Sequence, residues 1–541
     1  MKKLLVLIHI LCMVMFFSCE KFNTESENRV IGLDEKNIFD DKPLRILIKS
    51  NYNNFGVGTS GMEFSNDQLF NVLDEVNYEC YEQLGYTVEF ISFPEIKAGN
   101  EYLLTIQAGL EFDLIFPTKA GRSYTNLKNS YYWNDEFISY YMDLSPYLST
   151  YCPDVYMNMQ KYDYVMDMVT KDEKVFALYA GVPVVSHMAL LIKNEIIQEY
   201  NIQRINNFDE LHRLMELMRG KEENNDNQKV LVAERTLLNY AIIRAGYYNL
   251  NNDIVFQLND GSYKPYLIED TDIFDVFFNE FSRFFEQSYF MLQSPAPMRN
   301  GAFDPIFSEN GVSMFLADHI FYFIFQLFYF DDYPKENPWD TYSLFILDDS
   351  TPVINSADSI QLVPVPYTCT QPEKAISFVN WLFTDEDVGQ LLTFGTDKGK
   401  YPGYKTTSDG KITYEQNTHT VYLLDNLLAN FSDRLFPFDN KSMDQSKDYI
   451  ALAQKAIYPP LYRFLETNHN ENMRSFELMG MSYYNNLVMK QREEYINSSI
   501  RLLFEDPKAV TAHEMKTTLD SMTDKDTALR NYKDFVEKLF R

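Results

Sequence analysis

The residues of this sequence best suited to contact a solute are polar and aromatic residues on loops that follow predicted strands. They are Asn51, Tyr52, Asn53, Thr118, Lys119, Tyr124, Trp133, Tyr179, Asp318, His319, Tyr401 and Tyr404. Amides and phenols hydrogen-bond neutral polyols, and a flat aromatic face can stack on a sugar ring. This set predicts non-covalent binding of a neutral polar molecule, and for each residue a purely structural role remains the alternative.

The sequence lacks the common motifs of catalytic sites. The motifs GxSxG, HExxH and GxxxxGK[ST] do not occur, and the seven histidines are scattered. Residues 56–61 match the dinucleotide pattern GxGxxG, but the predicted helix begins too late for its N-terminus to meet a pyrophosphate. We therefore expect no catalytic residue, no cofactor and no metal site. A surface glycoside hydrolase is the enzyme alternative, because an acidic, aromatic-rich protein with many carboxylates could contain a catalytic pair. No two carboxylates can be singled out among the 78 acidic residues.

The N-terminus carries the pattern of an export signal. Lys2 and Lys3 precede an apolar run over 4–17, and Ser18 stands before Cys19. The run holds 14 residues, too short to span a hydrocarbon core of roughly 30 Å comfortably, so we expect no retained membrane span. The pattern predicts a lipoprotein signal peptide over 1–18, then the lipidated Cys19 and a flexible tether up to residue 42. A plain signal peptide with a chance cysteine is the alternative.

The mature chain is strongly acidic. The formal charge is −30, and removal of residues 1–18 takes away two lysines, which leaves −32. Such a charge disfavours nucleic acid as a partner, and it disfavours anionic lipid except through the anchor. The body keeps Cys80, Cys152 and Cys369, an odd number without metal-like spacing. This favours three buried thiols over one disulfide with a leftover thiol.

The apolar pattern alternates between strand and helix lengths in the first part of the body. Strands are predicted over 44–48, 86–93 and 113–116, with helices over 66–84 and 101–110, and this alternation predicts a parallel sheet covered on both faces. The run 175–193 predicts two buried strands with a break at 181–183. Further strands are predicted over 311–316, 345–347 and 359–365, and helices over 375–383, 444–458, 473–504, 513–522 and 526–540.

Four segments, taken in order, carry a resemblance to a known family. They are Glu111–Phe116, Tyr141–Leu148, Val175–Ile192 and Glu373–Asp387, which follow the lipobox-like Cys19 and the opening strand. In this order the chain resembles the family 1 extracellular solute-binding proteins, the sugar-binding class of ABC importer receptors. Its long helical end resembles the extension of a Gram-positive lipoprotein subgroup. It departs from the family at 317–322, where a glycine-tryptophan loop is replaced, and this puts the ligand in doubt.

The resemblance implies a periplasmic-binding-protein-like type II fold, with two discontinuous α/β lobes and a ligand cleft between them. It assigns residues 43–183 and 312–358 to lobe 1, residues 184–311 and 359–405 to lobe 2, and residues 406–541 to a helical extension packed on lobe 2. In this arrangement the strand before Asp318 returns the chain to the first lobe, Tyr179 lies at the first crossing between lobes, and the helix near 375–383 belongs to the second lobe.

The implied function is that of an extracytoplasmic lipoprotein on the cell membrane. By lobe closure it would capture a carbohydrate, with an oligosaccharide expected, and deliver it as a monomer to ABC permease subunits. A peptide or amino-acid receptor is the runner-up, and a ligand sensor of the same fold is a further alternative.

Overall fold

The structure is a computed structural model of the chain. It describes residues 42–49, 66–93, 109, 111–116, 118–119, 138–181, 185–219, 229–251, 254–259, 264–292, 313–318, 342–347, 350–355, 361–385, 387–389, 391, 405–406, 412–413, 451–459 and 487–522. The signal peptide, the tether, the glycine-rich loop 56–61 and the predicted helix 526–540 lie outside these ranges, as does almost all of the predicted helix 101–110.

The first lobe is built around a parallel sheet of three strands. These are β1 (Leu44–Lys49), β2 (Val88–Phe93) and β3 (Leu114–Phe116), in the order β2-β1-β3. The helix α2 (Asn66–Leu84) connects β1 to β2, as the alternating pattern predicted. Leu44, Ile46 and Leu114 are fully buried, because both faces of a parallel sheet are covered by other elements and its strands are therefore apolar.

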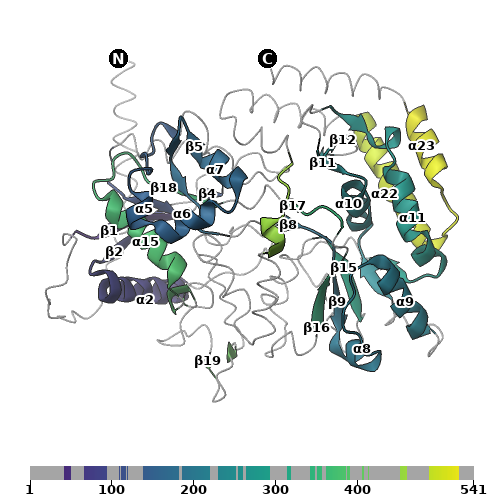
Figure 1. Ribbon diagram of the computed structural model, residues 1–541, viewed down its shortest axis with the longest axis horizontal. Coiled ribbons are helices and arrows are strands. Elements are labelled where there is room, and N and C mark those ends of the chain that lie inside the picture. Colours follow the sequence, from purple (N-terminus) through teal and green to yellow (C-terminus); the bar gives the residue numbers. More distant parts are fainter. Residues whose placement is uncertain are drawn as a thin grey trace.

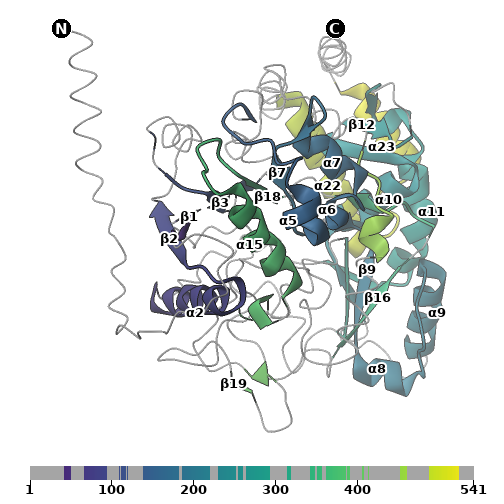
Figure 2. The ribbon, with the colours of Figure 1, turned by 60° about the vertical axis from the view of Figure 1, so that its left-hand side comes forward.

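Later segments complete this lobe. Its second small sheet has the order β4 (Thr118–Lys119), β18 (Gln361–Pro364) and β7 (Ala177–Leu178), with β18 antiparallel to both neighbours. The remaining elements are α5 (Leu148–Tyr151), α6 (Pro153–Met159), α7 (Asp163–Val169), the hairpin strands β5 (Thr170–Lys171) and β6 (Lys174–Val175), and α15 (Pro372–Thr384). Figure 1 shows these elements grouped on the left, and Figure 2 shows α15 in front of the sheet.

The second lobe has a mixed sheet of five strands. The order is β14 (Phe290–Leu292), β10 (Val230–Val232), β15 (Met314–Ala317), β9 (Ala189–Lys193) and β16 (Tyr342–Ile346). The strand β10 is parallel to both of its neighbours, whereas β9 is antiparallel to both of its own. The helices are α8 (Asn194–Glu199), α9 (Phe208–Arg219), α10 (Glu234–Arg244) and α11 (Ile273–Glu286). Edge-to-face phenylalanine rings fill the core between α9 and α11, with Phe208 and Phe281 at 5.0 Å.

A small antiparallel sheet lies between the cores of the two lobes. It consists of β11 (Tyr247–Asn251), β12 (Ile254–Gln257) and β13 (Tyr266–Leu267), and the 3₁₀ turn η4 (Ile268–Asp270) follows it. Successive side chains of a strand point to opposite faces. Accordingly Ile254 and Phe256 belong to the first hydrophobic core and Val255 to the second. This sheet therefore contributes to both cores.

The two-lobed α/β architecture is confirmed, but the assignment of residues 312–358 to lobe 1 and 359–405 to lobe 2 is wrong for the described elements. β15 and β16 both pair with β9 in the second lobe. In the first lobe, β18 pairs with β4 and β7, and α15 packs on α6 there. The strands of both lobes are short and apolar, so pattern alone cannot tell which sheet a returning strand joins.

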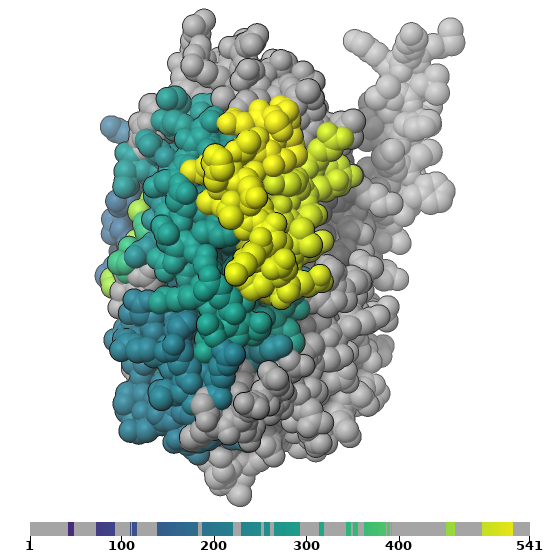
Figure 3. Space-filling view, turned by 90° about the vertical axis from the view of Figure 1, so that its right-hand side faces the viewer, coloured from purple at the N-terminus to yellow at the C-terminus, as the bar shows by residue number. Residues whose placement is uncertain are grey.

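The C-terminal helices α22 (Leu487–Glu505) and α23 (Ala512–Ser521) pack on the second lobe. Figure 3 shows them in yellow against the teal surface of that lobe. Arg492 Nη2 donates to Glu269 Oε2 at 2.5 Å and Nη1 to the carbonyl of Leu519 at 3.0 Å, so one buried guanidinium joins α22 to η4 and α23. A capping box of Thr511 and Glu514 begins α23.

Two further strands, β19 (Lys405–Thr406) and β20 (Ile412–Thr413), pair antiparallel. Within the described ranges, no helix combines the length and the apolar character that crossing a membrane requires.

Candidate interlobe site

Three segments of the chain lie side by side where the two lobes meet. The predicted pair of strands over 175–193 is three short strands, β7, β8 (Val185–Ser186) and β9, and β8 carries the chain from the first lobe to the second. It pairs antiparallel with β17 (Ile354–Asn355), which precedes β18. Ile457 bridges Ile354 in parallel, and its N–H donates to the Val353 carbonyl at 2.7 Å. We call β8, β17 and residues 451–459 the joint (Figure 1).

The first crossing leaves the first lobe beside Tyr179. Asn158 Nδ2 donates to the Gly181 carbonyl at 2.9 Å, and both residues are buried. A Cβ added at Gly181 would lie 3.2 Å from Tyr179 Oη, which is tighter than ordinary van der Waals contact. Tyr179 itself is buried in the first core. The structure therefore places this candidate behind the crossing, where it supports the backbone of Gly181.

Asp318 lies at the other end of the first crossing. Its carbonyl accepts the His187 N–H at 2.8 Å, and its carboxylate Oδ2 accepts Asn239 Nδ2 at 3.0 Å. Asp318 and His187 are both buried. The expectation that the strand before Asp318 returns to the first lobe is wrong, because this strand is β15 of the second sheet. Asp318 therefore fixes the second-lobe end of the crossing.

The second crossing is held by an arginine that sequence reasoning missed. Arg244, the last residue of α10, donates from Nη1 to Ser350 Oγ at 2.5 Å and to Thr351 Oγ1 at 3.5 Å. Its Nε lies 4.0 Å from Glu280 Oε1 of α11. Both helices belong to the second lobe, so the start of the crossing is tied to that lobe. An arginine at a helix C-terminus is common, and nothing in the pattern marks its partner about a hundred residues away.

The third segment contacts the first lobe through an aromatic stack. The rings of Tyr458 and Tyr164 have centroids 4.6 Å apart and an interplanar angle of 19°. Both side chains are buried, and Tyr164 lies on α7. Since α15 belongs to the first lobe and α22 to the second, the chain passes between the lobes again after α15, and this stack marks the described part of that passage.

The other candidates are described only in part. Thr118 and Lys119 form β4 directly after β3, and their backbones pair with Leu362 and Gln361 of β18. This location at the carboxyl end of a parallel strand is where open α/β sheets bind ligands. The other sequence-predicted residues lie outside the described residues: Cys19, Asn51, Tyr52, Asn53, Tyr124, Trp133, His319, Tyr401 and Tyr404.

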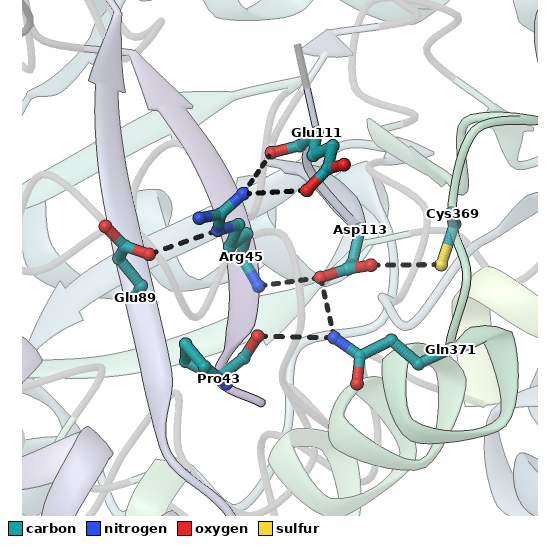
Figure 4. A network of polar contacts seen from close by, with 7 residues as sticks. All are labelled: Pro43, Arg45, Glu89, Glu111, Asp113, Cys369 and Gln371. Atoms are coloured by element: carbon teal, nitrogen blue, oxygen red, sulfur yellow. Dashed lines mark hydrogen bonds and ion pairs between the residues drawn. The ribbon is translucent and has the colours of Figure 1, made fainter. Parts of the chain in front are cut away.

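A polar network joins the amino ends of β1 and β3 to the start of α15 (Figure 4). Asp113 Oδ2 accepts the Arg45 N–H at 2.9 Å and Gln371 Nε2 at 3.1 Å, and its Oδ1 accepts the Cys369 thiol at 3.3 Å. Burial, and then the nearby Asp113 charge, raise the pKa of the Cys369 thiol, so it stays protonated and can donate. A protonated thiol is a poor nucleophile, so we interpret these contacts as a structural network.

The cysteines behave as the sequence predicted. Cys80, Cys152 and Cys369 are free and buried, which confirms three thiols rather than a disulfide. Burial raises the pKa of Cys80 and Cys152 as well. Among the residues described, no group of three or more His, Cys, Asp or Glu side chains is placed to share a metal ion.

Comparison with known proteins finds similarity among solved structures. No family model matches the chain. No curated protein matches it either. The N-glycan transport solute-binding protein NgtS of Streptococcus pneumoniae, in complex with Man1GlcNAc, has 12% sequence identity, covers 92% of this chain and 99% of its own, and gives a TM-score of 0.46. An extracellular solute-binding protein of Bifidobacterium longum subsp. infantis has 12% identity, covers 93% and 99%, and gives 0.47.

The sugar-binding protein MalE of Xanthomonas citri has 10% identity, covers 86% of this chain and 100% of its own, and gives a TM-score of 0.43. All three of these similar proteins are solute-binding or sugar-binding proteins.

Proposed function

We propose that this chain is an extracytoplasmic receptor that captures a carbohydrate by closure of its two lobes and delivers it to an ABC importer. The observation that carries the proposal is the joint. Two α/β bodies with separate sheets meet at β8, β17 and residues 451–459, which lie side by side. Such a connection lets two rigid bodies change their relative orientation through a few backbone dihedrals, which is the geometry of hinge closure around a ligand.

The rigidity of each lobe supports this reading. The helices α2, α5, α6 and α15 pack in the core of the first lobe, and α9, α10, α11 and α22 pack in the core of the second. A core that is close-packed transmits a rotation without deforming. Rearrangement on binding is therefore concentrated at the joint.

The ligand class rests on the sequence candidates. Amide, phenol and hydroxyl groups suit a neutral polyol, and the charge of the mature chain disfavours a polyanion. Thr118 and Lys119 are the candidates that we place at the binding face, since they follow β3. Tyr179 and Asp318 are assigned to the support of the joint, because both are buried and already contact its first crossing.

Export and anchoring belong to the same proposal. The basic, apolar and Ser18-Cys19 segments support secretion and lipidation of Cys19, with the tether carrying a monomeric body at the cell membrane. Metabolic labelling with a palmitate analogue tests this step. Incorporation into the parent and its loss in Cys19→Ala are expected, and incorporation into Cys19→Ala would contradict it.

The central experiment is thermal unfolding of residues 20–541 in the presence of mono- and oligosaccharides, peptides and amino acids. A ligand at about 100 times its Kd that binds only the folded state adds roughly 2.7 kcal/mol. With an unfolding entropy of about 1 kcal/mol/K for a chain of this size, Tm rises by about 2–3 °C.

Each outcome of that screen assigns the function differently. A shift with an unmodified glycan supports the sugar receptor. A shift with peptides or amino acids alone transfers the assignment to the runner-up, and cleavage of a glycan without a shift transfers it to a hydrolase. Genes for permease subunits next to this one favour the importer, whereas a gene for a sensor kinase favours the ligand sensor.

A further inference from the structure

We propose that one edge of the first lobe is a contact surface for the lipid bilayer, and that Tyr140 and Tyr367 make this contact. The surface is the amino edge of the β2-β1-β3 sheet, by which we mean the edge at which these three strands begin. The lipid anchor that brings the edge to the bilayer rests on the proposed function. The contact itself can be tested without a solute and with a synthetic anchor.

Two short segments present a pair of tyrosine rings at the surface. Tyr141 and Pro366 form an antiparallel bridge, and the Tyr367 N–H donates to the Tyr140 carbonyl at 2.9 Å. Tyr141 and Pro366 are buried, whereas Tyr367 is 52% exposed and Tyr140 is partly buried. The two ring centroids of Tyr140 and Tyr367 lie 6.2 Å apart. The paired backbones therefore hold both rings together as a cross-strand pair, on the face opposite the buried pair.

The tyrosine pair lies at the edge of the sheet where the chain enters the body. The Cys369 thiol, two residues after Tyr367, donates to Asp113, which directly precedes β3. Gln371 Nε2 donates at 3.2 Å to the carbonyl of Pro43, which directly precedes β1 (Figure 4). The pair and the first residues of the body therefore share the amino edge.

The entry of the chain at this edge is fixed by the first turn of α15. Lys374 is 1% exposed, and its Nζ donates to the Lys42 carbonyl at 2.5 Å and to Gln371 Oε1 at 3.1 Å. The same nitrogen lies 4.8 Å from the ring centroid of Tyr86. Because Lys42 is held, the distance from the anchor to the body is limited by residues 20–41. A chain of that length spans at most about 75 Å.

A contact close to the anchor point needs little intrinsic affinity. A short linker makes the second contact intramolecular, which raises the effective concentration of the partner. This gain is largest for a surface next to the point of attachment, and the tyrosine pair is such a surface. Tyrosine also suits the partner, because its ring is apolar, its hydroxyl is polar, and it is enriched at membrane–water interfaces.

The charges at the amino edge select the kind of lipid. Arg45 pairs with Glu89 and Glu111, whose side chains are 45% and 82% exposed. The two exposed carboxylates outnumber the one guanidinium, so anionic headgroups are disfavoured. The contact is therefore expected on a zwitterionic bilayer, through the rings and not through charge attraction.

The contact would hold the proposed binding face away from the membrane. β1 has six residues, and a strand rises about 3.3 Å per residue, so the two edges of the sheet are about 20 Å apart. Thr118 and Lys119 follow β3 at the carboxyl edge. With the amino edge on the lipid, this face is open to the outer solution. The orientation favours capture, and delivery to a permease requires release of the weak contact.

The test attaches residues 20–541 to phosphatidylcholine vesicles through an N-terminal histidine tag and a nickel-chelating lipid. A dye is placed at Glu111→Cys on the amino edge or at Leu217→Cys on α9, and its quenching by nitroxide-labelled headgroups is measured. Both positions are exposed, and the three native thiols of the body are buried, so labelling is selective. Quenching is expected to be several-fold greater at position 111 than at position 217.

The tyrosine pair is tested by Tyr140→Ser with Tyr367→Ser, which is expected to lower quenching at position 111 to the value at position 217. Tyr367→Ser alone replaces the double variant if that variant does not fold. Leu502→Ser on α22 is the matched control, because Leu502 is 50% exposed against 52% for Tyr367. We expect it to leave quenching unchanged. Vesicles that also contain phosphatidylglycerol should give less quenching at position 111.

Equal quenching at the two dye positions overturns the lipid contact. Parent-like quenching in a folded Tyr367→Ser or double variant overturns the role of the pair. If a neutral polysaccharide abolishes quenching in the parent, the pair binds a glycan and the lipid assignment is wrong. Failure of every solute in the thermal screen would remove the proposed function and leave the quenching result unchanged.

Discussion

The buried ion pair between Arg492 and Glu269 makes a quantitative prediction about the C-terminal helices. Their side chains are 0% and 1% exposed, and Glu269 Oε1 has no hydrogen-bond partner in the part of the chain that the structure describes. Arg492→Met would leave the Glu269 carboxylate in the core without its cation. Removal of one partner of a buried pair costs about 3–5 kcal/mol. Because Arg492 also donates to the Leu519 carbonyl, α23 would lose a contact as well.

The expected loss can be followed by thermal unfolding monitored by circular dichroism. If the whole chain unfolds as one cooperative unit, its unfolding entropy is about 1 kcal/mol/K and the substitution would lower Tm by about 3–5 °C. If the second lobe unfolds alone, the entropy is smaller and the fall in Tm is larger. Replacement of both partners, Arg492→Met with Glu269→Leu, should recover most of the loss, because an apolar pair avoids desolvation of two charges.

The double-mutant cycle provides the decisive comparison. A coupling free energy of several kcal/mol is expected between the two positions. A loss below about 1 kcal/mol in Arg492→Met, which is the range of exposed pairs, would refute the reasoning that α22 is joined to the second lobe through a desolvated charge pair. Lys516→Met is the matched control, because its contact with Asp275 of α11 is exposed.

Three other predictions concern local features. Gly181→Ala should destabilise the fold by about 1 kcal/mol or more through overpacking against Tyr179 Oη, and the added substitution Tyr179→Phe should restore part of that loss in the same unfolding assay. Glu173→Gly in the turn of the β5–β6 hairpin, where φ is 63°, should stabilise by roughly 1 kcal/mol, and an unchanged or lower midpoint would contradict it. The raised pKa of the three body thiols means that the folded state keeps protons which the unfolded state releases above about pH 8.5, so Tm should fall as pH rises through that range. A variant with all three replaced by Ala should show a smaller fall.

The first lobe was predictable from the sequence because its elements are local. The run Leu44–Ile48 is bounded by turn residues, and α2 and β2 follow in the order that a parallel sheet requires. The lobe to which each of β15 and β18 belongs could not be predicted, because each strand is a short apolar run that fits either sheet. Its partner is chosen by tertiary pairing, and no residue within the run encodes that choice.

Some residues at the joint could be identified from the sequence and others could not, for a similar reason. Tyr179 and Asp318 were found because they flank apolar runs, although their contacts make them supports. Asn158, Arg244 and Tyr458 were missed, since each lies within or beside a helical stretch and acts on a partner far along the chain or on a different element. Nothing in a helix pattern distinguishes such a residue from an ordinary surface or core position.

Three connections side by side restrict what the joint permits. A single flexible strand would let the lobes adopt many relative orientations, and this freedom would be lost whenever a solute was bound. The pairing of β8 with β17, and of Ile354 with Ile457, ties the connections into one narrow ribbon. A ribbon bends about one axis more readily than it twists or shears. Open and closed forms would then differ by one rotation, and a smaller part of the binding free energy would be offset by ordering of the lobes. The discontinuous path of the chain, which passes between lobes repeatedly, is what makes this restriction possible.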